Sequence, residues 1–288
     1  MACITNILFP IDFSRPSVGM AAYVQRAATL FGARVSLIHV IDPSSINGLE
    51  TLDRSPFQVQ DEHLESGRKR LNSFCLPEFP LETVPRILAV GDPATEIVQA
   101  ARHGNFDLII MPTHAGIFRR MLLGSTTAKV LDSAHCPVLT SMHSEVIAPR
   151  PLQHRVWVCA VGLGAQSERV LRYAKAAVDE VPSKLAIVHA VQSGGRDMQV
   201  RLDLEERIEF AGRQEARKRI AELQRAVGLD VPVHLAVGPV KDALLEAARQ
   251  SDADALIIGR NHGSGAKGLL RDLTYAVVRD SPFPVLSV

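Results

Sequence analysis

The sequence predicts an α/β protein made of two repeated doubly wound domains, each with a five-stranded, mainly parallel sheet and helices on both faces. The first observation is a repeat: residues 88–102, LAVGDPATEIVQAAR, recur 147 positions later as residues 235–249, LAVGPVKDALLEAAR. The second is an alternation of short apolar strands with amphipathic helices, which is typical of βαβ units in a parallel sheet buried on both faces. Because solenoid repeats span only about 20 to 50 residues, so long a period indicates a duplicated domain.

Strands and helices alternate through the first half. Short apolar runs closed by turn residues predict five strands, and apolar periodicity between them predicts three helices. Residues 42–57, DPSSINGLETLDRSPF, are rich in turn residues and lack periodicity, so we expect a loop flanking a ligand cleft. The expected strands are 7–11, 34–41, 84–90, 107–111 and 137–141, and the expected helices are 17–31, 94–102 and 126–133.

The second half repeats this order, with a longer charged helix before its third strand. Residues 143–154 contain two prolines and are the expected linker, so we place the domains at residues 1–143 and 155–288. The expected strands are 156–161, 184–191, 233–237, 255–258 and 285–288, and the expected helices are 167–181, 202–227, 241–250 and 269–279.

Composition narrows the function. With 288 residues, 47% of them hydrophobic, the chain can form two cores. Lysine and arginine (32) almost balance aspartate and glutamate (31), which argues against a nucleic-acid partner. The four cysteines form no CxxC pair and are expected to pack as small hydrophobes in a reducing compartment. The chain has no run of about 20 apolar residues and no leader pattern, so we expect a cytoplasmic protein without a membrane partner.

Ligand chemistry is expected at the carboxyl ends of the first-half strands, where ligands bind in open parallel sheets. One such end is Asp12. Another leads into MPTHAGIFRRMLLGSTTAKVL, in which Gly124-Ser125-Thr126 stands at the start of a helix. Glycine permits close backbone approach, and the first N–H groups of a helix attract anions, so this is a candidate phosphate site. Arg119 and Arg120 lie on the same connection and can add positive charge.

These segments resemble the universal stress protein superfamily. The resemblance rests on FPIDFS, HVID, VGDPATEI and MPTH…LLGSTTAKVL…CPVLTS, and it covers both halves. It implies a tandem regulatory protein and, in domain 1, a site for ATP or another adenine nucleotide, with Mg²⁺ bound only together with the nucleotide. Asp12 and Val40 would then face adenosine, and Gly124, Ser125 and Thr126 would face phosphates. The full candidate nucleotide site is Pro10, Asp12, Val40, Met111, His114, Gly116, Arg119, Arg120, Gly124, Ser125 and Thr126.

The first half departs from the family pattern of glycine, two residues, glycine, nine residues and glycine-Ser/Thr. Pro112 and Ala115 stand at the first two glycine positions, and the stretch from Ala115 to Gly124 is one residue shorter. Pro112 has no N–H and a fixed φ, so the loop offers fewer backbone donors, and Gly116 can take the place of Ala115.

The second half departs further. Gly162 replaces the aspartate equivalent to Asp12, and Arg271-Asp272 replaces Gly124-Ser125. A carboxylate at the expected phosphate position would repel phosphate. We therefore expect domain 2 to be a structural partner without a family-type nucleotide site.

The duplication also separates structural residues from functional ones. His39 recurs as His189 although the second site is degenerate, which favours a hydrogen-bonded structural histidine. Asp12 is lost in the second copy, so the fold survives without it, although an aspartate at a strand end is most often a turn or cap residue.

Three classes of function are compatible with the sequence: a nucleotide-binding regulatory module, an interaction protein that binds no nucleotide and acts through its paired domains, and a slow ATP hydrolase. No GxxxxGK[ST], GxSxG or HExxH motif is present, so an enzyme is the least favoured. The family resemblance also implies that the fifth strands pair the two halves as an internal pseudo-dimer, with a homo-oligomer also compatible. The sequence identifies no protein partner.

Overall fold

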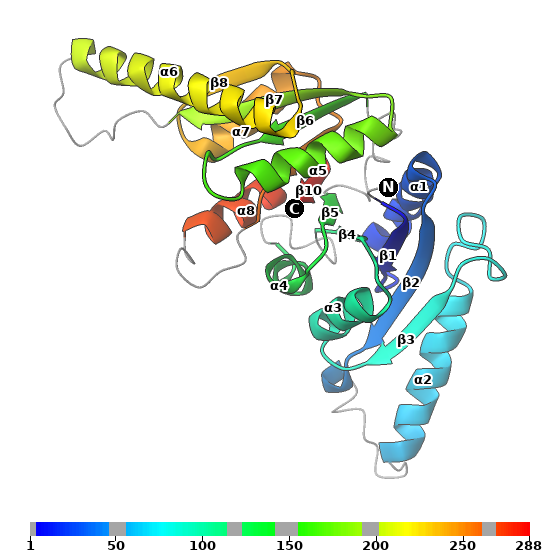
Figure 1. The fold of residues 1–288 in the computed structure, drawn as a ribbon. Coiled ribbons are helices and arrows are strands. Elements are labelled where there is room, and N and C mark those ends of the chain that lie inside the picture. Colours follow the sequence, from blue (N-terminus) through cyan, green and yellow to red (C-terminus); the bar gives the residue numbers. More distant parts are fainter. Residues whose placement is uncertain (1–3, 46–55, 114–122, 142–154, 192–201, 261–268) are drawn as a thin grey trace. The chain divides into compact units, whose positions relative to one another are not determined.

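The computed structural model describes residues 4–45, 56–113, 123–141, 155–191, 202–260 and 269–288 (Figure 1). The chain divides into two compact units, Ala2–Leu152 and Gln153–Val288. We refer to them as domain 1 and domain 2 and describe each by itself.

Domain 1 contains a five-stranded parallel sheet in the order β3-β2-β1-β4-β5. Strands β1, β2, β4 and β5 are largely buried, as their apolar sequence runs predict, and Leu8, Phe9 and Ile109 are completely inaccessible. The edge strand β3 is only half-buried. The strands are β1 (Asn6–Pro10), β2 (Arg34–Ile41), β3 (Arg86–Val90), β4 (Leu108–Pro112) and β5 (Val138–Ser141).

The helices of domain 1 cover both faces of this sheet. The chain moves from β1 to β2 and β3 in one direction and then crosses to β4 and β5 on the other side of β1. Right-handed crossovers therefore place α1 and α2 on one face and α3 and α4 on the other, where α3 and α4 pack together. The elements are α1 (Arg15–Phe31), the short η1 (Pro43–Ser45), α2 (Pro56–Asn72), α3 (Pro93–His103) and α4 (Ser125–Ser133).

Domain 2 repeats this architecture with the strand order β10-β9-β6-β7-β8, again parallel within the domain. The predicted fold class of two repeated doubly wound domains is confirmed. The strands are β6 (Val156–Ala160), β7 (Lys184–Val191), β8 (Val233–Val237), β9 (Ala255–Ile258) and β10 (Val285–Ser287), and the helices are α5 (Ser167–Glu180), α6 (Leu202–Val227), α7 (Val240–Gln250) and α8 (Leu269–Asp280).

Helix α2 is the element that the sequence interpretation missed. Its sequence, PFQVQDEHLESGRKRLN, is dominated by polar residues, and from residue 61 onward its only buried positions are Gly67 and Leu71. So sparse an apolar stripe carries little periodic signal. The expected loop 42–57 was therefore drawn too long, because α2 already begins at Pro56. Within the expected loop, residues 43–45 form η1, and residues 46–55 lie outside the described part.

Several element ends differ from expectation by one or two residues. The predicted start of β3 at Val84 is wrong, because the Val84 amide donates to Pro80 O at 3.0 Å within a turn. Helix α1 begins at Arg15 because the Ser14 side chain caps it by accepting from the Ser17 amide. Such shifts of one or two residues leave the order of elements unchanged.

The turn after the first strand is the same in both domains. Phe13 and the equivalent Leu163 have left-handed φ values of 60° and 57°, a conformation that costs a non-glycine residue about 1–2 kcal/mol. In each domain a histidine contacts the backbone two residues before this turn residue, since Nδ1 of His39 lies 2.9 Å from Ile11 O and Nδ1 of His189 lies 2.7 Å from Val161 O. The predicted structural role of these histidines is confirmed.

The glycine after the third strand is also structural in both domains. Gly91 and Gly238 have φ values of 154° and 127°, which L side chains rarely adopt. A Cβ on Gly91 would lie 2.8 Å from Glu96 Oε1. The repeated VG turn therefore reflects backbone geometry rather than ligand binding.

The described cysteines are free thiols. Cys136 and Cys159 are buried, and burial raises the pKa of Cys159 to about 12. Cys75 is half-buried with its pKa raised to about 11, mainly by burial, and Cys3 lies outside the described residues. The three described cysteines pack as the small hydrophobes that we expected. Across the described helices, none combines the length and apolar character that a membrane span requires.

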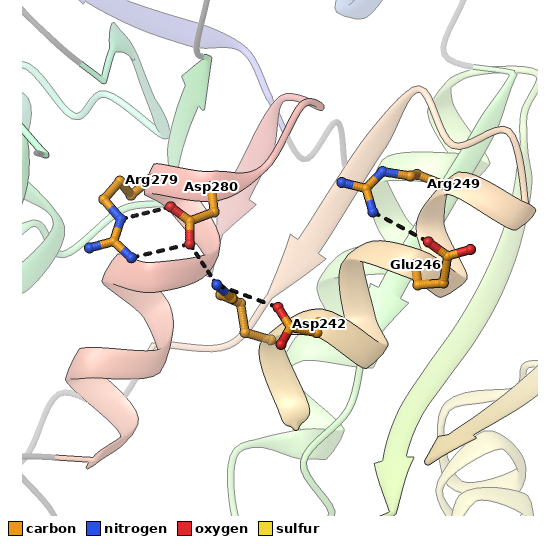
Figure 2. Close-up of polar contacts among 6 residues, drawn as sticks. Asp242, Glu246, Arg249, Arg279 and Asp280 are labelled. Carbon is orange, nitrogen blue, oxygen red and sulfur yellow. Dashed lines mark hydrogen bonds and ion pairs between the residues drawn. The ribbon is translucent and has the colours of Figure 1, made fainter. Parts of the chain in front are cut away.

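Each domain ties its last two helices together with an ion pair, but at different positions. In domain 2, Nζ of Lys241 on α7 lies 2.7 Å from the Asp280 carboxylate of α8. Arg279 forms a forked pair with the same carboxylate at 2.7 and 3.1 Å (Figure 2). These two cations hold the pKa of Asp280 low, at about 2. In domain 1, Lys129 of α4 contacts Asp92 before α3 at 2.9 Å.

Candidate functional site

A pocket of about 200 Å³ opens at the carboxyl end of the domain 1 sheet. It lies beside β1 and β4, the neighbouring strands between which the chain order reverses, where ligands bind in open α/β sheets. Its lining comes from the ends of β1, β2 and β4 and from the starts of α1, α3 and α4. The lining residues are Pro10, Ile11, Asp12, Ser17, Ile38, Val40, Pro93, Ile97, Met111, Pro112, Gly124, Ser125, Thr126 and Thr127.

Seven predicted site residues meet in this pocket although they come from four separate segments of the chain. They are Pro10, Asp12, Val40, Met111, Gly124, Ser125 and Thr126. The other four predicted residues, His114, Gly116, Arg119 and Arg120, lie outside the described residues.

Asp12 is an exposed carboxylate held in a fixed orientation. Its Oδ1 accepts hydrogen bonds from the Ser14 amide at 3.0 Å and from the buried Ser17 hydroxyl at 2.6 Å. Both hydrogen bonds use the same oxygen, so the other carboxylate oxygen retains acceptor capacity for a ligand hydroxyl or amino group. Ser17 therefore positions Asp12 at the pocket.

One wall of the pocket is apolar. Side chains from β1, β2, β4 and α3 supply it, and most of them are buried. An apolar wall beside a few convergent polar groups is the usual composition of a small-molecule site. The apolar residues are Pro10, Ile11, Ile38, Val40, Pro93, Ile97, Met111 and Pro112.

Another part of the lining is the start of α4, where no side-chain hydrogen bond caps the helix. Gly124 is the N-cap residue, and its own amide donates to Thr113 O at 2.9 Å, while the Ala128 amide donates to Gly124 O at 2.9 Å. The first amides of the helix lack intrahelical acceptors, so their N–H groups point out of its start. In contrast, Ser14 caps α1 and Asp92 caps α3.

Pro112, which replaces the first glycine of the family pattern and lacks an N–H, is the last residue of β4 rather than part of the following loop. Pro112 pairs with Ser141 of β5, and its carbonyl oxygen accepts from the Thr127 hydroxyl at 3.1 Å. This bond fixes the first turn of α4 against β4. The start of the helix is therefore anchored even though Pro112 supplies no N–H of its own.

Sequence interpretation missed Ile11, Ser17, Ile38, Pro93, Ile97 and Thr127 as pocket residues. A signal existed for Pro93 and Ile97, because they are four positions apart and share a helix face next to the VGDP turn. The others are buried residues whose types suit any core or cap, so their type alone gave no indication of a site.

The corresponding turn of domain 2 keeps its backbone without an aspartate. Gly162 follows β6 before the left-handed Leu163, and a Cβ at Gly162 would have no heavy atom within 4 Å. Crowding therefore does not explain the loss of the aspartate there. The side chains of Arg271 and Asp272 lie outside the described part.

Comparison with known proteins agrees with the repeat. The sequence pattern of the universal stress protein family matches residues 4–141 and 155–288. A universal stress protein of Methanocaldococcus jannaschii is 34% identical over 138 residues, which are 46% of this chain and 79% of that protein. One from Mycolicibacterium smegmatis is 26% identical over 290 residues, covering 98% of this chain and 96% of that protein.

A solved structure shares the whole architecture. The crystal structure of a universal stress protein from Archaeoglobus fulgidus matches with a TM-score of 0.66 and 25% identity, over 98% of this chain and 95% of that one. Both halves of the sequence match the family, and both halves have the same doubly wound topology. The chain therefore belongs to the universal stress protein family and contains two copies of its domain.

Proposed function

We propose that domain 1 binds ATP or a related adenine nucleotide in the pocket at the end of β1, and that the protein is a regulatory module rather than an enzyme. The observation that carries this proposal is the meeting of a positioned carboxylate, an apolar wall and an uncapped helix start in one pocket. A nucleotide needs these three environments for its nucleoside hydroxyl or amino groups, its base and its phosphates. Mg²⁺ would enter only with the phosphates.

The size of the pocket indicates how the nucleotide would lie. At about 200 Å³ it is smaller than the roughly 300–1,000 Å³ of pockets for drug-sized ligands. The nucleoside part would occupy it, with the base on the apolar wall and Asp12 beside the sugar or base. The phosphates would then extend over the start of α4, where N–H groups and the helix dipole favour negative charge.

Nucleotide binding is proposed for domain 1 only, with one nucleotide per chain. Gly162 cannot supply the carboxylate that Asp12 offers. Restoring a single carboxylate with Gly162→Asp should not create a second site, because the helix start in domain 2 carries Arg271-Asp272 in place of Gly124-Ser125.

Titration calorimetry with ATP, ADP, AMP, cyclic nucleotides and adenosine tests this proposal. We expect a stoichiometry near one, and Asp12→Ala should weaken adenosine and ATP binding about tenfold to hundredfold, the effect of losing a charged hydrogen bond worth roughly 1.5–3 kcal/mol. Asp42→Ala is the matched control, because Asp42 also accepts from a backbone amide two residues on (Ser44, 2.8 Å) but does not line the pocket. Equal occupancy of both domains would refute the asymmetry.

The alternative of an interaction protein remains a distinct outcome. If neither adenosine nor ATP binds the unmodified protein at millimolar concentration, the nucleotide proposal fails and the paired-domain interaction protein replaces it.

We also propose that the two domains pack as an internal pseudo-dimer through their fifth strands, β5 and β10. A short edge strand presents unpaired backbone groups that can pair with another strand, and each domain has one as its fifth strand. Small-angle X-ray scattering should then give a radius of gyration near 19 Å, the value expected for one compact particle of this length. A clearly larger value, typical of separate beads on a linker, would contradict the packing.

A further inference from the structure

An ion pair lies at the edge of the proposed nucleotide site. Lys129 is one helical turn beyond Ser125 on α4, and its Nζ lies 2.9 Å from Oδ2 of Asp92. Asp92 directly precedes Pro93, a pocket residue, and its Oδ1 caps α3 by accepting from the amide and hydroxyl of Thr95 at 3.1 and 2.8 Å. The pair therefore joins the second turn of α4 to the start of α3, and both helices contribute residues to the pocket lining.

The second copy of the domain lacks both partners. Pro239 replaces Asp92 at the repeat offset, and Ala276 replaces Lys129 when positions are counted back from the shared proline before the fifth strand. Domain 2 joins its corresponding helices with Lys241 and Asp280 instead (Figure 2). The fold thus tolerates the loss of the Asp92–Lys129 pair, and the pair is present in the copy that has the candidate site.

Breaking the Lys129–Asp92 ion pair also costs little free energy. The Lys129 and Asp92 side chains are 60% and 45% exposed, and exposed ion pairs contribute only about 0–1 kcal/mol. A charge-assisted bond to a phosphate contributes roughly 1.5–3 kcal/mol. A phosphate at the start of α4 would therefore compete successfully with Asp92 for the ammonium group.

Helix geometry brings Lys129 within reach of that phosphate. Residues i and i+4 lie on the same face about 6 Å apart, and side chains on a helix lean toward its N-terminus. Ser125 and Lys129 are both exposed, as a shared outer face requires. A lysine in this position extends back over the helix start where the N–H groups are free of intrahelical acceptors.

We propose that Lys129 is a phosphate ligand of the domain 1 site and that Asp92 holds it when no nucleotide is bound. This inference rests on the proposed nucleotide site and deepens it: the site would prefer adenine nucleotides that carry phosphates over adenosine. Phosphate binding would exchange the Lys129–Asp92 bond for a Lys129–phosphate bond. The tie between the starts of α3 and α4 would thereby be released on binding.

Calorimetry on the full chain with two variants tests the exchange. Lys129→Ala should weaken ATP binding about tenfold or more and leave adenosine unchanged. Asp92→Asn keeps an equally good N-cap on α3 but frees Lys129, so ATP should bind about three- to tenfold tighter, with adenosine again unchanged. In the Lys129→Ala background most of this gain should disappear, because only the loss of direct repulsion between Asp92 and phosphate then remains.

Domain 2 supplies matched controls. Lys241→Ala and Asp280→Asn break the corresponding helix tie away from the site and should change neither ligand's affinity. If Lys129→Ala weakens adenosine and ATP equally, or if the effects of the two domain 1 variants simply add, Lys129 has only a structural role and the inference is overturned. Absence of adenosine binding to the unmodified protein would instead refute the nucleotide site itself.

Discussion

Ser125→Asp should remove most of the phosphate-dependent affinity of domain 1 while slightly stabilising α4. Ser125 is the first residue of α4 and lines the pocket. Two unit charges about 5 Å apart interact by about 3 kcal/mol at an effective dielectric constant of 20, so a carboxylate here should weaken ATP binding by more than a hundredfold. The same carboxylate at a helix N-terminus contributes about 0.3–1 kcal/mol of stability.

The variant is informative because it should lower ATP affinity while raising stability, whereas general destabilisation of the domain would lower both. Calorimetry should show ATP lost and adenosine retained, and thermal unfolding should show an unchanged or raised Tm. Ser125→Asn is the control, because asparagine is similar in size to aspartate but uncharged. This variant should keep most of the ATP affinity. ATP binding that survives Ser125→Asp at high and low salt would place the phosphates away from α4.

The duplication allowed the fold to be predicted from the sequence. Where a residue recurs in both halves, as His39 and His189 do, a structural role could be inferred from the sequence, and the structure confirms it. Helix α2 was not predicted because its sequence carries little apolar periodicity. Its residues are mostly solvated, and the tertiary contacts that stabilise it involve few apolar positions, so the local pattern resembled a loop.

The site was predictable only in part. Strand ends and a glycine before a helix have recognisable sequence signals, and they correctly brought Asp12, Val40 and Gly124 to one place. Ser17 and the Asp92–Lys129 pair have none, because each depends on a distance between segments that only the folded chain defines. The sequence already accounts for Asp92 as the N-cap of α3, so nothing in it indicates the additional ion pair with Lys129.

Arg86→Met should destabilise domain 1 by about 3 kcal/mol. The Arg86 guanidinium donates to three carbonyl oxygens: Nε to Leu71 at 3.0 Å, one terminal nitrogen to Val84 at 2.8 Å and the other to Phe79 at 2.7 Å. These bonds hold the end of α2 and the turns that follow it against β3, and burial lowers the pKa of the guanidinium. Methionine keeps the apolar stem but leaves the three acceptors without a donor, at about 1 kcal/mol or more each.

Domain 2 explains why this effect should be local to domain 1. Val233 occupies the position of Arg86, and the Gln224 side chain instead accepts from the Val231 amide at 2.7 Å. Thermal unfolding should therefore lower the domain 1 transition by roughly 10 °C and leave the domain 2 transition in place. Arg86→Lys should fail to rescue it, because one ammonium cannot reproduce the fork. Arg34→Met, at the exposed start of β2, is the control and should change stability by less than about 0.5 kcal/mol. An Arg86→Met protein as stable as this control would show that water replaces the guanidinium at no cost.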